Sequence, residues 1–383
     1  MIYLDSASTA KYRNIDDIIV NTITQSMIDS WMNPSSLYAA SIKDKINKCR
    51  SNIASFIGAK SDEIYYTSGA SESNNWAIRG WADTCLSYDC SNVNVITTPI
   101  EHKSILSAVI NPNLNVTVKY CDVDKFGLVN LKCLEDLLWI CDKEHVLVSV
   151  CAANNEIGTI QNIKKISDLV HSYGGILHID ATQAVGHIPI NVEEIGVDMM
   201  SASGHKISPA LRGIGFLYKK QGLNIRPLIY GAQENGLRGG TENTYGIIGL
   251  NKAIEYCDFN YETMKDMCKK RDYFINLLES KFGCKLNGHR KYRLLNNVNV
   301  TFPQNITGES LLYMLDMNNI KVSSGSACNS KSIEPSHVLK AIGLTDEEAM
   351  KSIRFTLSDD ITYEDIDKVI EEIDKSIKLI ELN

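Results

Sequence analysis

The sequence predicts an α/β protein with a mostly parallel sheet flanked by helices, followed by a smaller α+β C-terminal domain. Apolar runs of strand length alternate with helical patterns through the first two thirds of the 383 residues. This alternation is typical of a parallel sheet covered by helices. After about Tyr256 the pattern changes to a Lys-, Asp- and Met-rich helical segment. The length and the 44% hydrophobic content allow a large core and favour two domains over one.

The expected strands of the sheet are short apolar runs at residues 93–97, 116–120, 146–151, 176–180, 199–202 and 214–218. Apolar residues recur at helical spacing from Ile163 to Val170, and Gly174 and Gly175 follow as a stop signal. This gives a strand-helix-strand unit. In the last third we expect a strand at 297–302 and a helix from Glu309.

The charge balance does not indicate direct nucleic-acid binding. The formal net charge is −7 and the pI is about 5.7, so there is no overall basic surface. The N-terminus has no basic segment followed by an apolar stretch, and no apolar window approaches the length of a membrane span. We therefore expect a soluble, cytoplasmic protein without a membrane partner.

The cysteines predict neither disulfides nor a metal site. There are eleven, an odd number, and no Cys-x-x-Cys pair occurs. We expect reduced intracellular thiols, mostly buried, with one reactive thiol at most.

A turn rich in small residues follows an early β-rich run. Residues 65–73 read Tyr-Tyr-Thr-Ser-Gly-Ala-Ser-Glu-Ser and lead into a helical pattern. Such a turn directs backbone N–H groups and hydroxyls toward a phosphate at a helix N-terminus. An ordinary helix cap is the alternative, and the turn alone favours it.

Polar side chains also follow two of the expected strands. Glu101-His102-Lys103 comes after the strand at 93–97, where a histidine can stack on an aromatic cofactor or simply cap a helix. Asn154 and Asn155 come directly after the strand at 146–151, at the edge where α/β sheets bind ligands. Turn formation also explains these asparagines.

An aspartate and a lysine carry the strongest chemical signal. Asp180 ends an apolar strand, and Ser203-Gly204-His205-Lys206 follows the next one. A pyridoxal phosphate (PLP) site needs a lysine amine for the Schiff base and a carboxylate beside the pyridine nitrogen. A solvated surface lysine is the alternative for Lys206 alone.

The last third contains a thiol and an arginine in informative settings. Cys328 lies in a run of small polar residues, 323–330, which favours an exposed, reactive thiol in a mobile loop over an inert one. Arg354 lies between apolar neighbours in a strand pattern. It suits a clamp on an amino-acid carboxylate, and a structural ion pair is an equal alternative.

Together these motifs resemble the NifS/IscS-type cysteine desulfurases, a branch of the class V aminotransferases with PLP fold type I. The resemblance covers nearly the whole chain. It includes the segments 2–5, 33–36, 67–73, 101–103, 154–158, 180–183, 203–206, 238–243, 323–328 and 352–355. The length of the serine-rich cysteine loop is similar to that of the NifS/IscS group rather than the SufS-like group. The resemblance implies a PLP-binding large domain at 13–255. It also implies a small C-terminal domain at 256–383, which carries the cysteine loop and is joined by residues 1–12.

The resemblance also implies roles for individual residues. Lys206 would hold PLP as a Schiff base, His102 would stack on its ring, and Asp180 would pair with the pyridine nitrogen. Gln183 and Asn155 would lie near the ring oxygen and the substrate. The implied phosphate ligands are Ala70, Ser71, Ser203, His205 and, from the neighbouring subunit of a homodimer with shared active sites, Thr241.

On the substrate side, the resemblance implies that Arg354, with Asn33 nearby, holds the carboxylate of L-cysteine. Cys328 would be the nucleophile that accepts sulfur. The chain departs from the family pattern at Tyr38, at residues 230–234 and after Lys206. It also reads Ser6-Ala7-Ser8-Thr9-Ala10 where Asn-Ala-Ala-Thr-Thr-Pro is usual. These departures surround the mouth of the implied site.

The expected activity is PLP-dependent conversion of L-cysteine to L-alanine, with a persulfide left on Cys328. Lys206 would remove the Cα proton, and His102 would assist ionisation of the thiol. The implied partner is a sulfur acceptor, such as an iron-sulfur scaffold or a tRNA thiolation enzyme. A selenocysteine lyase of the same fold and a non-catalytic scaffold are the alternatives.

Overall fold

The computed structural model describes residues 1–11, 21, 24–25, 28, 31–88, 93–111, 115–141, 145–207, 211–324 and 334–382. Its main feature is a seven-stranded sheet with the order β2-β8-β7-β6-β5-β3-β4. The strands are β2 (Ile64–Thr67), β3 (Asn94–Thr97), β4 (Thr117–Tyr120), β5 (Val146–Cys151), β6 (Ile176–Asp180), β7 (Met199–Ser203) and β8 (Gly215–Lys219). Only β8 runs antiparallel to its neighbours. The prediction of a mostly parallel sheet is confirmed.

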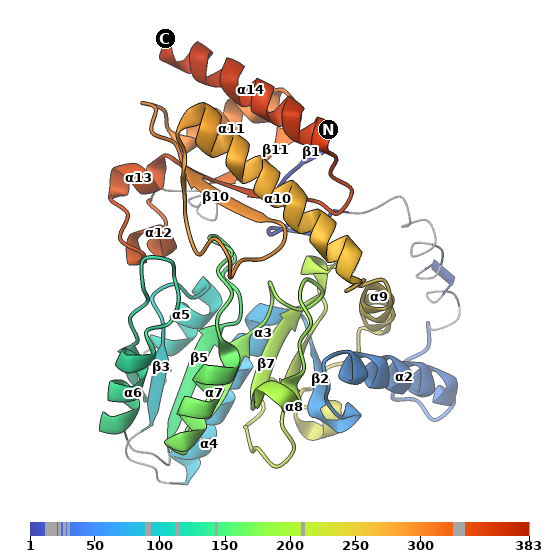
Figure 1. Ribbon diagram of the computed structural model, residues 1–383. Coiled ribbons are helices and arrows are strands. Elements are labelled where there is room, and N and C mark those ends of the chain that lie inside the picture. The colour runs from blue at the N-terminus through green and yellow to red at the C-terminus, as the bar shows by residue number, and fades with distance from the viewer. Residues whose placement is uncertain are drawn as a thin grey trace.

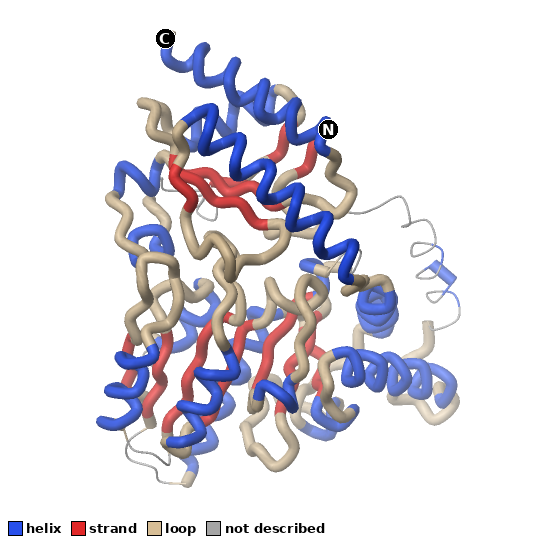
Figure 2. The backbone as a smooth tube through the Cα atoms, in the orientation of Figure 1, coloured by secondary structure: helices blue, strands red, loops and turns tan. Residues whose placement is uncertain are grey.

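Helices cover both faces of this sheet, and Figure 2 shows the resulting layers. The first face packs against α2 (Ala40–Phe56), α6 (Leu131–Ile140), α7 (Ile163–Ser172), α8 (Val192–Ile195) and α9 (Thr244–Glu255). The second face packs against α3 (Ala70–Asn75), the π-helical turn Trp76–Gly80, α4 (Trp81–Ser87) and α5 (Lys103–Val109). With both faces covered, the strands other than the edge strand β4 are almost wholly buried, which explains their continuous apolar runs.

The helix at 163–172 illustrates how the sequence sets these elements. Asn162 caps α7 by accepting a hydrogen bond from the Lys165 N–H. Its buried residues Ile163, Ile166 and Val170 recur at helical spacing and face the sheet.

A second, smaller layer lies above the first in Figure 1. Its antiparallel sheet has the order β12-β13-β10-β9. The strands are β9 (Lys285–Leu286), β10 (Asn297–Thr301), β12 (Ser323–Ser324) and β13 (Ser352–Thr356), and the covering helices are α10 (Tyr261–Phe282), α11 (Gly308–Met317) and α14 (Tyr363–Glu381). The N-terminal strand β1 (Ile2–Tyr3) pairs in parallel with β11 (Ile320–Lys321), and Leu4 joins the core of this layer.

Two short helices connect the layers. Apolar residues of α12 (His337–Ala341) and α13 (Asp346–Met350) pack with Ile100, Cys151 and Ile157, which belong to the larger layer. The chain segment that follows residues 325–333 is therefore held against the larger layer.

One expectation about the 323–330 run was wrong. Ser323 and Ser324 form β12 and pair with Ile353 and Arg354 of β13, and Ser323 is buried. Small serine side chains fit this edge because the backbone, not the side chain, makes the pairing. The remainder of the run, Cys328 included, lies outside the described residues.

Among the helices in the described part of the chain, none combines the length and the apolar character needed to cross a bilayer.

Candidate active site

A cavity of about 650 Å³ lies where the carboxyl ends of the parallel strands meet the smaller layer. Ligands of open α/β sheets bind at this edge. The lining residues come from five parts of the chain far apart in sequence: Ala7–Thr9, Ser68–Glu72, a group from His102 to Gln183, Ser203–Gly213 and Arg354.

Lys206 projects into this cavity from the 3₁₀ turn Gly204–Lys206, which directly follows β7. Its Nζ donates hydrogen bonds to the carbonyl oxygens of Ala7 and Ser8, at 2.5 and 2.7 Å. On the backbone side, His187 Nε2 lies 3.1 Å from the Lys206 carbonyl oxygen. The turn therefore holds a primary amine at a fixed place in the cavity wall.

Asp180 is the last residue of β6 and is 6% exposed. One carboxylate oxygen accepts from Asn74 Nδ2 at 2.8 Å, and the other accepts from the Thr182 N–H at 2.9 Å. Thr182 Oγ1 is buried, lines the cavity and has no hydrogen-bond partner among the described residues. A carboxylate and an unsatisfied hydroxyl thus face the same space, where a polar ligand would satisfy both.

Behind Asp180, a buried chain of side chains crosses three neighbouring strands. His178 lies between Ser149 and Ser201, with both hydroxyl oxygens 2.9 Å from its ring nitrogens. All three residues are fully buried. Burial lowers the pKa of His178 to about 4, although Asp180 opposes the shift. The imidazole is therefore neutral at physiological pH, and it fixes the strand that presents Asp180.

The turn at residues 68–71 precedes a helix that continues from α3 through the π-helical turn to α4. Its Gly69 has φ +153°, a conformation that favours glycine, and an added Cβ at Gly215 would lie 2.6 Å from the Gly69 Cα. Glu72 accepts a hydrogen bond from the Ser68 N–H at 2.8 Å. The turn is thus held close to the sheet with its helix N-terminus toward the cavity, as an anion site requires.

Two histidines line the cavity in their neutral form. His102 caps α5, and its Nδ1 accepts from the Ser104 N–H at 3.1 Å. Burial lowers the pKa of His102, with Asp180 opposing. His205 lies 3.2 Å from Thr9 Oγ1, and burial, assisted by Lys206 and Arg212, lowers its pKa to about 4.

Arg354 reaches the cavity from β13 of the smaller layer. Its Nη1 donates to the Asn155 carbonyl oxygen at 3.0 Å, and its Nη2 donates to Asp5 and Ser8 at 2.8 Å each. Its Nε is buried without a partner among the described residues. The guanidinium therefore retains free donors beside the cavity.

The structure brings most of the residues expected at the site into this one cavity. They are Ala70, Ser71, His102, Asn155, Asp180, Gln183, Ser203, His205, Lys206 and Arg354. Asn33 and Thr241 do not line it. Asn33 is exposed and its side chain accepts from the Ser35 N–H at 2.9 Å. Thr241 is exposed at the edge of a second cavity with Ser68 and Arg238.

Sequence reasoning missed several lining residues. Ala7, Ser8 and Thr9 were noticed only as a departure from a family pattern, yet all three line the cavity. Thr182 lies within the matching segment 180–183, but no role was assigned to it. Its position two residues after Asp180, past the end of β6, was the available signal.

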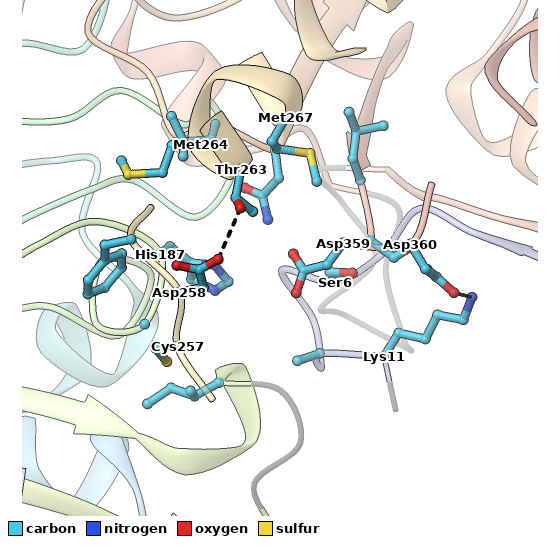
Figure 3. Close-up of a pocket in the computed structure, with 18 of the residues that line it drawn as sticks. Ser6, Lys11, His187, Cys257, Asp258, Thr263, Met264, Met267, Asp359 and Asp360 are labelled. Atoms are coloured by element: carbon cyan, nitrogen blue, oxygen red, sulfur yellow. Dashed lines mark hydrogen bonds and ion pairs between the residues drawn. The ribbon is translucent and has the colours of Figure 1, made fainter. Parts of the chain in front are cut away.

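A separate cavity of about 220 Å³ lies at the junction of the two layers, and Figure 3 shows its lining. Asp258 there accepts from Thr263 at 3.0 Å, and Lys11 pairs with Asp360 at 2.6 Å. Ser6 also faces this cavity, and its hydroxyl is buried without a partner among the described residues. Residues 6–9 therefore touch two different cavities.

Residues 2–369 match the family model of class-V aminotransferases. The chain is 40% identical to the cysteine desulfurase IscS of Dictyoglomus turgidum, over 98% of this chain and 94% of that protein. It is also 40% identical to IscS of Methanosarcina thermophila, over 98% of this chain and 92% of that protein. A solved structure described as a NifS-like protein superposes with a TM-score of 0.88 at 32% identity, covering all of both chains.

Proposed function

The chain belongs to the aminotransferase class-V family as a PLP-dependent cysteine desulfurase, and from this premise we propose which of its residues do the chemistry. The observation that carries the proposal is the convergence of an amine, a carboxylate and an arginine, Lys206, Asp180 and Arg354, on one cavity.

The residues of this cavity fit PLP. Asp180 suits the pyridine nitrogen, the helix N-terminus at Ala70 and Ser71 suits the phosphate, and the unsatisfied Thr182 hydroxyl suits a polar substituent. Ser203, His205 and Gln183 complete the proposed cofactor ligands. When bound, PLP supplies an electron sink for the charge that develops at the substrate Cα.

We assign proton transfer at Cα to Lys206. Its amine donates hydrogen bonds to the carbonyl oxygens of Ala7 and Ser8. A flexible lysine side chain on a short, sheet-anchored turn can exchange these acceptors for a cofactor and a substrate. Asp180 would pair with the ring nitrogen, and hydrogen bonds from Asn74 and the Thr182 N–H hold its carboxylate in position.

Arg354 is proposed to bind the substrate carboxylate, with Asn155 beside it and Asn33 as a further ligand. The free donors of the guanidinium support the role of Arg354. Asn33 lies away from the cavity, so its role is supported only by the family resemblance.

The proposed nucleophile is Cys328, which lies outside the described residues. Both flanks of its segment end beside the site. Upstream, Ser323 pairs with Arg354 in the sheet. Downstream, Ser336 donates to Glu156, and His337 Nε2 lies 2.9 Å from the carbonyl oxygen of Glu101, which precedes His102. We propose that His102 accepts the thiol proton, and burial supports this role because it lowers the pKa of the imidazole.

The test is the fate of sulfur in Cys328→Ser. We expect this variant to bind PLP and to exchange the Cα proton of L-cysteine with solvent deuterium, yet to release almost no sulfide. Intact-mass analysis of the wild-type protein after brief exposure to L-cysteine should show one added sulfur on the Cys328 peptide. Normal sulfide release by the serine variant would contradict the assignment and favour direct lyase chemistry.

The sulfur acceptor and the assembly are further parts of the proposal. We propose a homodimer in which Thr241 serves the phosphate site of the neighbouring subunit, and a partner protein, either an iron-sulfur scaffold or a tRNA thiolation enzyme, that takes the sulfur. The exposed position of Thr241 on its own subunit supports the first part. Comparing alanine formation from cysteine and selenocysteine distinguishes the desulfurase from a selenocysteine lyase.

A further inference from the structure

Ser8 occupies a hydrogen-bonding position on Arg354 that a bound carboxylate would need. Its hydroxyl oxygen lies 2.8 Å from Arg354 Nη2, and its hydroxyl donates to Asp5 Oδ1, also at 2.8 Å. Asp5 Oδ1 itself accepts from the same Nη2 at 2.8 Å. The three side chains form a closed triangle of hydrogen bonds.

The geometry of a guanidinium explains how this triangle affects carboxylate binding to Arg354. Its five N–H groups lie in one plane, and a carboxylate binds two of them at once along one edge. One such edge joins Nε to Nη2, and the other joins Nη1 to Nη2. Both edges therefore use a hydrogen on Nη2. In Arg354, Nη2 already donates to both Asp5 and Ser8, and the two acceptor oxygens lie on the same side of this nitrogen because they are themselves 2.8 Å apart.

A substrate carboxylate that reaches Nη2 from the cavity side therefore competes with one of these two acceptors. Ser8 is the one placed to leave. It is exposed and lines the cavity, whereas Asp5 is only partly exposed and is not among the lining residues. Asp5 also carries the counter-charge of a guanidinium that is 8% exposed, and a buried charge without a partner is costly.

We propose that the Ser8 hydroxyl is a built-in competitor for the substrate carboxylate on Arg354, and that it weakens the binding of amino-acid substrates. Asp5 stays on Nη2 and acts as a positioning residue. This inference rests on the proposed role of Arg354. It concerns a feature of this chain, because alanine is usual at position 8 in the family pattern that the sequence resembles.

The test is Ser8→Ala, which removes the hydroxyl and leaves the backbone carbonyl that accepts from Lys206. In the PLP-loaded enzyme we expect the KM for L-cysteine to fall about 3- to 10-fold, the range that one net hydrogen bond supplies, with kcat little changed. Equilibrium binding to the same enzyme adds a second readout. The dissociation constant of L-alanine, measured by titration of the PLP absorbance, should fall by the same factor, whereas that of ethylamine, which lacks the carboxylate, should not change.

Ser6→Ala is the matched control. Ser6 belongs to the same segment, but it faces the junction cavity of Figure 3, and its hydroxyl makes no hydrogen bond among the described residues. Its loss should leave both constants unchanged. An unchanged or higher KM in Ser8→Ala would overturn the proposal. An equal gain in affinity for L-alanine and for ethylamine would also overturn it, because it would indicate a wider cavity rather than an Arg354 freed from Ser8.

A third variant separates this inference from the proposed function. Arg354→Lys should raise the KM for L-cysteine and weaken the binding of L-alanine, because lysine does not bind both carboxylate oxygens in the same plane. If Arg354→Lys had no such effect, the role of Arg354 itself would be wrong. If it had the effect and Ser8→Ala did not, only the role of Ser8 would be wrong.

Discussion

Arg238 donates two hydrogen bonds to Glu72, at 2.8 and 3.1 Å, and thereby ties the segment that carries Thr241 to the turn at residues 68–71. Burial pushes the pKa of Glu72 up, but the hydrogen bonds from Arg238 and Ser68 outweigh it and hold the pKa below its usual value. One carboxylate therefore organises two segments: the phosphate turn of its own subunit and the segment proposed to serve the neighbouring one.

Glu72→Gln should weaken PLP binding about tenfold, because it removes the charge that holds both segments, and hydrogen bonds to charged groups contribute about 1.5–3 kcal/mol. A titration of the apoenzyme with PLP measures the effect. Glu135→Gln, which breaks an exposed pair with Lys132, is the control and should leave PLP affinity unchanged. Equal affinity in Glu72→Gln and the wild type would show that the pair does not organise the phosphate site.

Mixing two inactive variants should restore activity if Thr241 acts across subunits. Lys206→Ala lacks the amine, and Thr241→Arg spoils the site of its neighbour. In a mixed dimer, one site combines an intact Lys206 with an intact Thr241. Random exchange at equal concentrations makes half of the dimers mixed, so about a quarter of wild-type activity should return. The assay is sulfide release after incubation. No recovery despite exchange seen by native mass spectrometry would contradict the shared site.

Asp180→Asn should retain most PLP but lose turnover by at least about a hundredfold. The phosphate contacts of other residues keep the cofactor in place, whereas the neutral amide no longer stabilises a protonated ring nitrogen. Bound PLP is measured by absorbance and turnover by alanine formation. Asp168→Asn, on the exposed face of α7, is the control. Substantial turnover in Asp180→Asn would remove Asp180 from the mechanism.

Glu101 should make stability fall as pH rises toward 8. Its carboxyl is 1% exposed, and burial raises its pKa to about 8, against about 4.5 in the unfolded chain. Between these values the folded protein binds a proton that the unfolded chain has released, so each pH unit costs up to about 1.4 kcal/mol. Above pH 8 the penalty stops growing.

Glu101→Gln removes this dependence. Relative to the wild type, the variant should gain stability between pH 5.5 and 8, measured as the shift of the urea midpoint at each pH. The donor Thr98, at 2.6 Å from the Glu101 carboxyl, keeps an amide oxygen as its acceptor. Parallel pH curves for the two proteins would show that the buried carboxyl does not titrate in this range.

Local patterns predict most of the sheet and mark several residues of the cavity, whereas the roles of the site residues come from the family resemblance. The strand at 146–151 and the helix from Ile163 follow from apolar runs and spacing, and these elements place Asn155 at a strand end. The position of Asp180 at the end of β6 follows in the same way. Such features depend on residues a few positions apart, which is the range that periodicity reports.

Periodicity does not predict the contacts that join distant segments. Ser8 and Arg354 are separated by 346 positions, and no local pattern links them. Likewise, Ser323 and Ser324 look like loop residues by composition, yet they pair with β13 because tertiary contacts override weak propensity. Thr241 and Asn33 were named through family resemblance, and a single chain does not bring them to the cavity.

The parallel pairing of β1 with β11 has a consequence for how the protein is made. Ile2 pairs with Ile320, so the first strand of this pair is synthesised long before its partner. At about 5–20 residues per second, the delay is on the order of 15–60 seconds. Until then the nascent chain can complete the seven-stranded sheet, but Asp5 cannot pair with Arg354, which is synthesised later still. Closure of the candidate active-site cavity should therefore be the final event of folding. The partly synthesised chain should then be inactive toward its substrate.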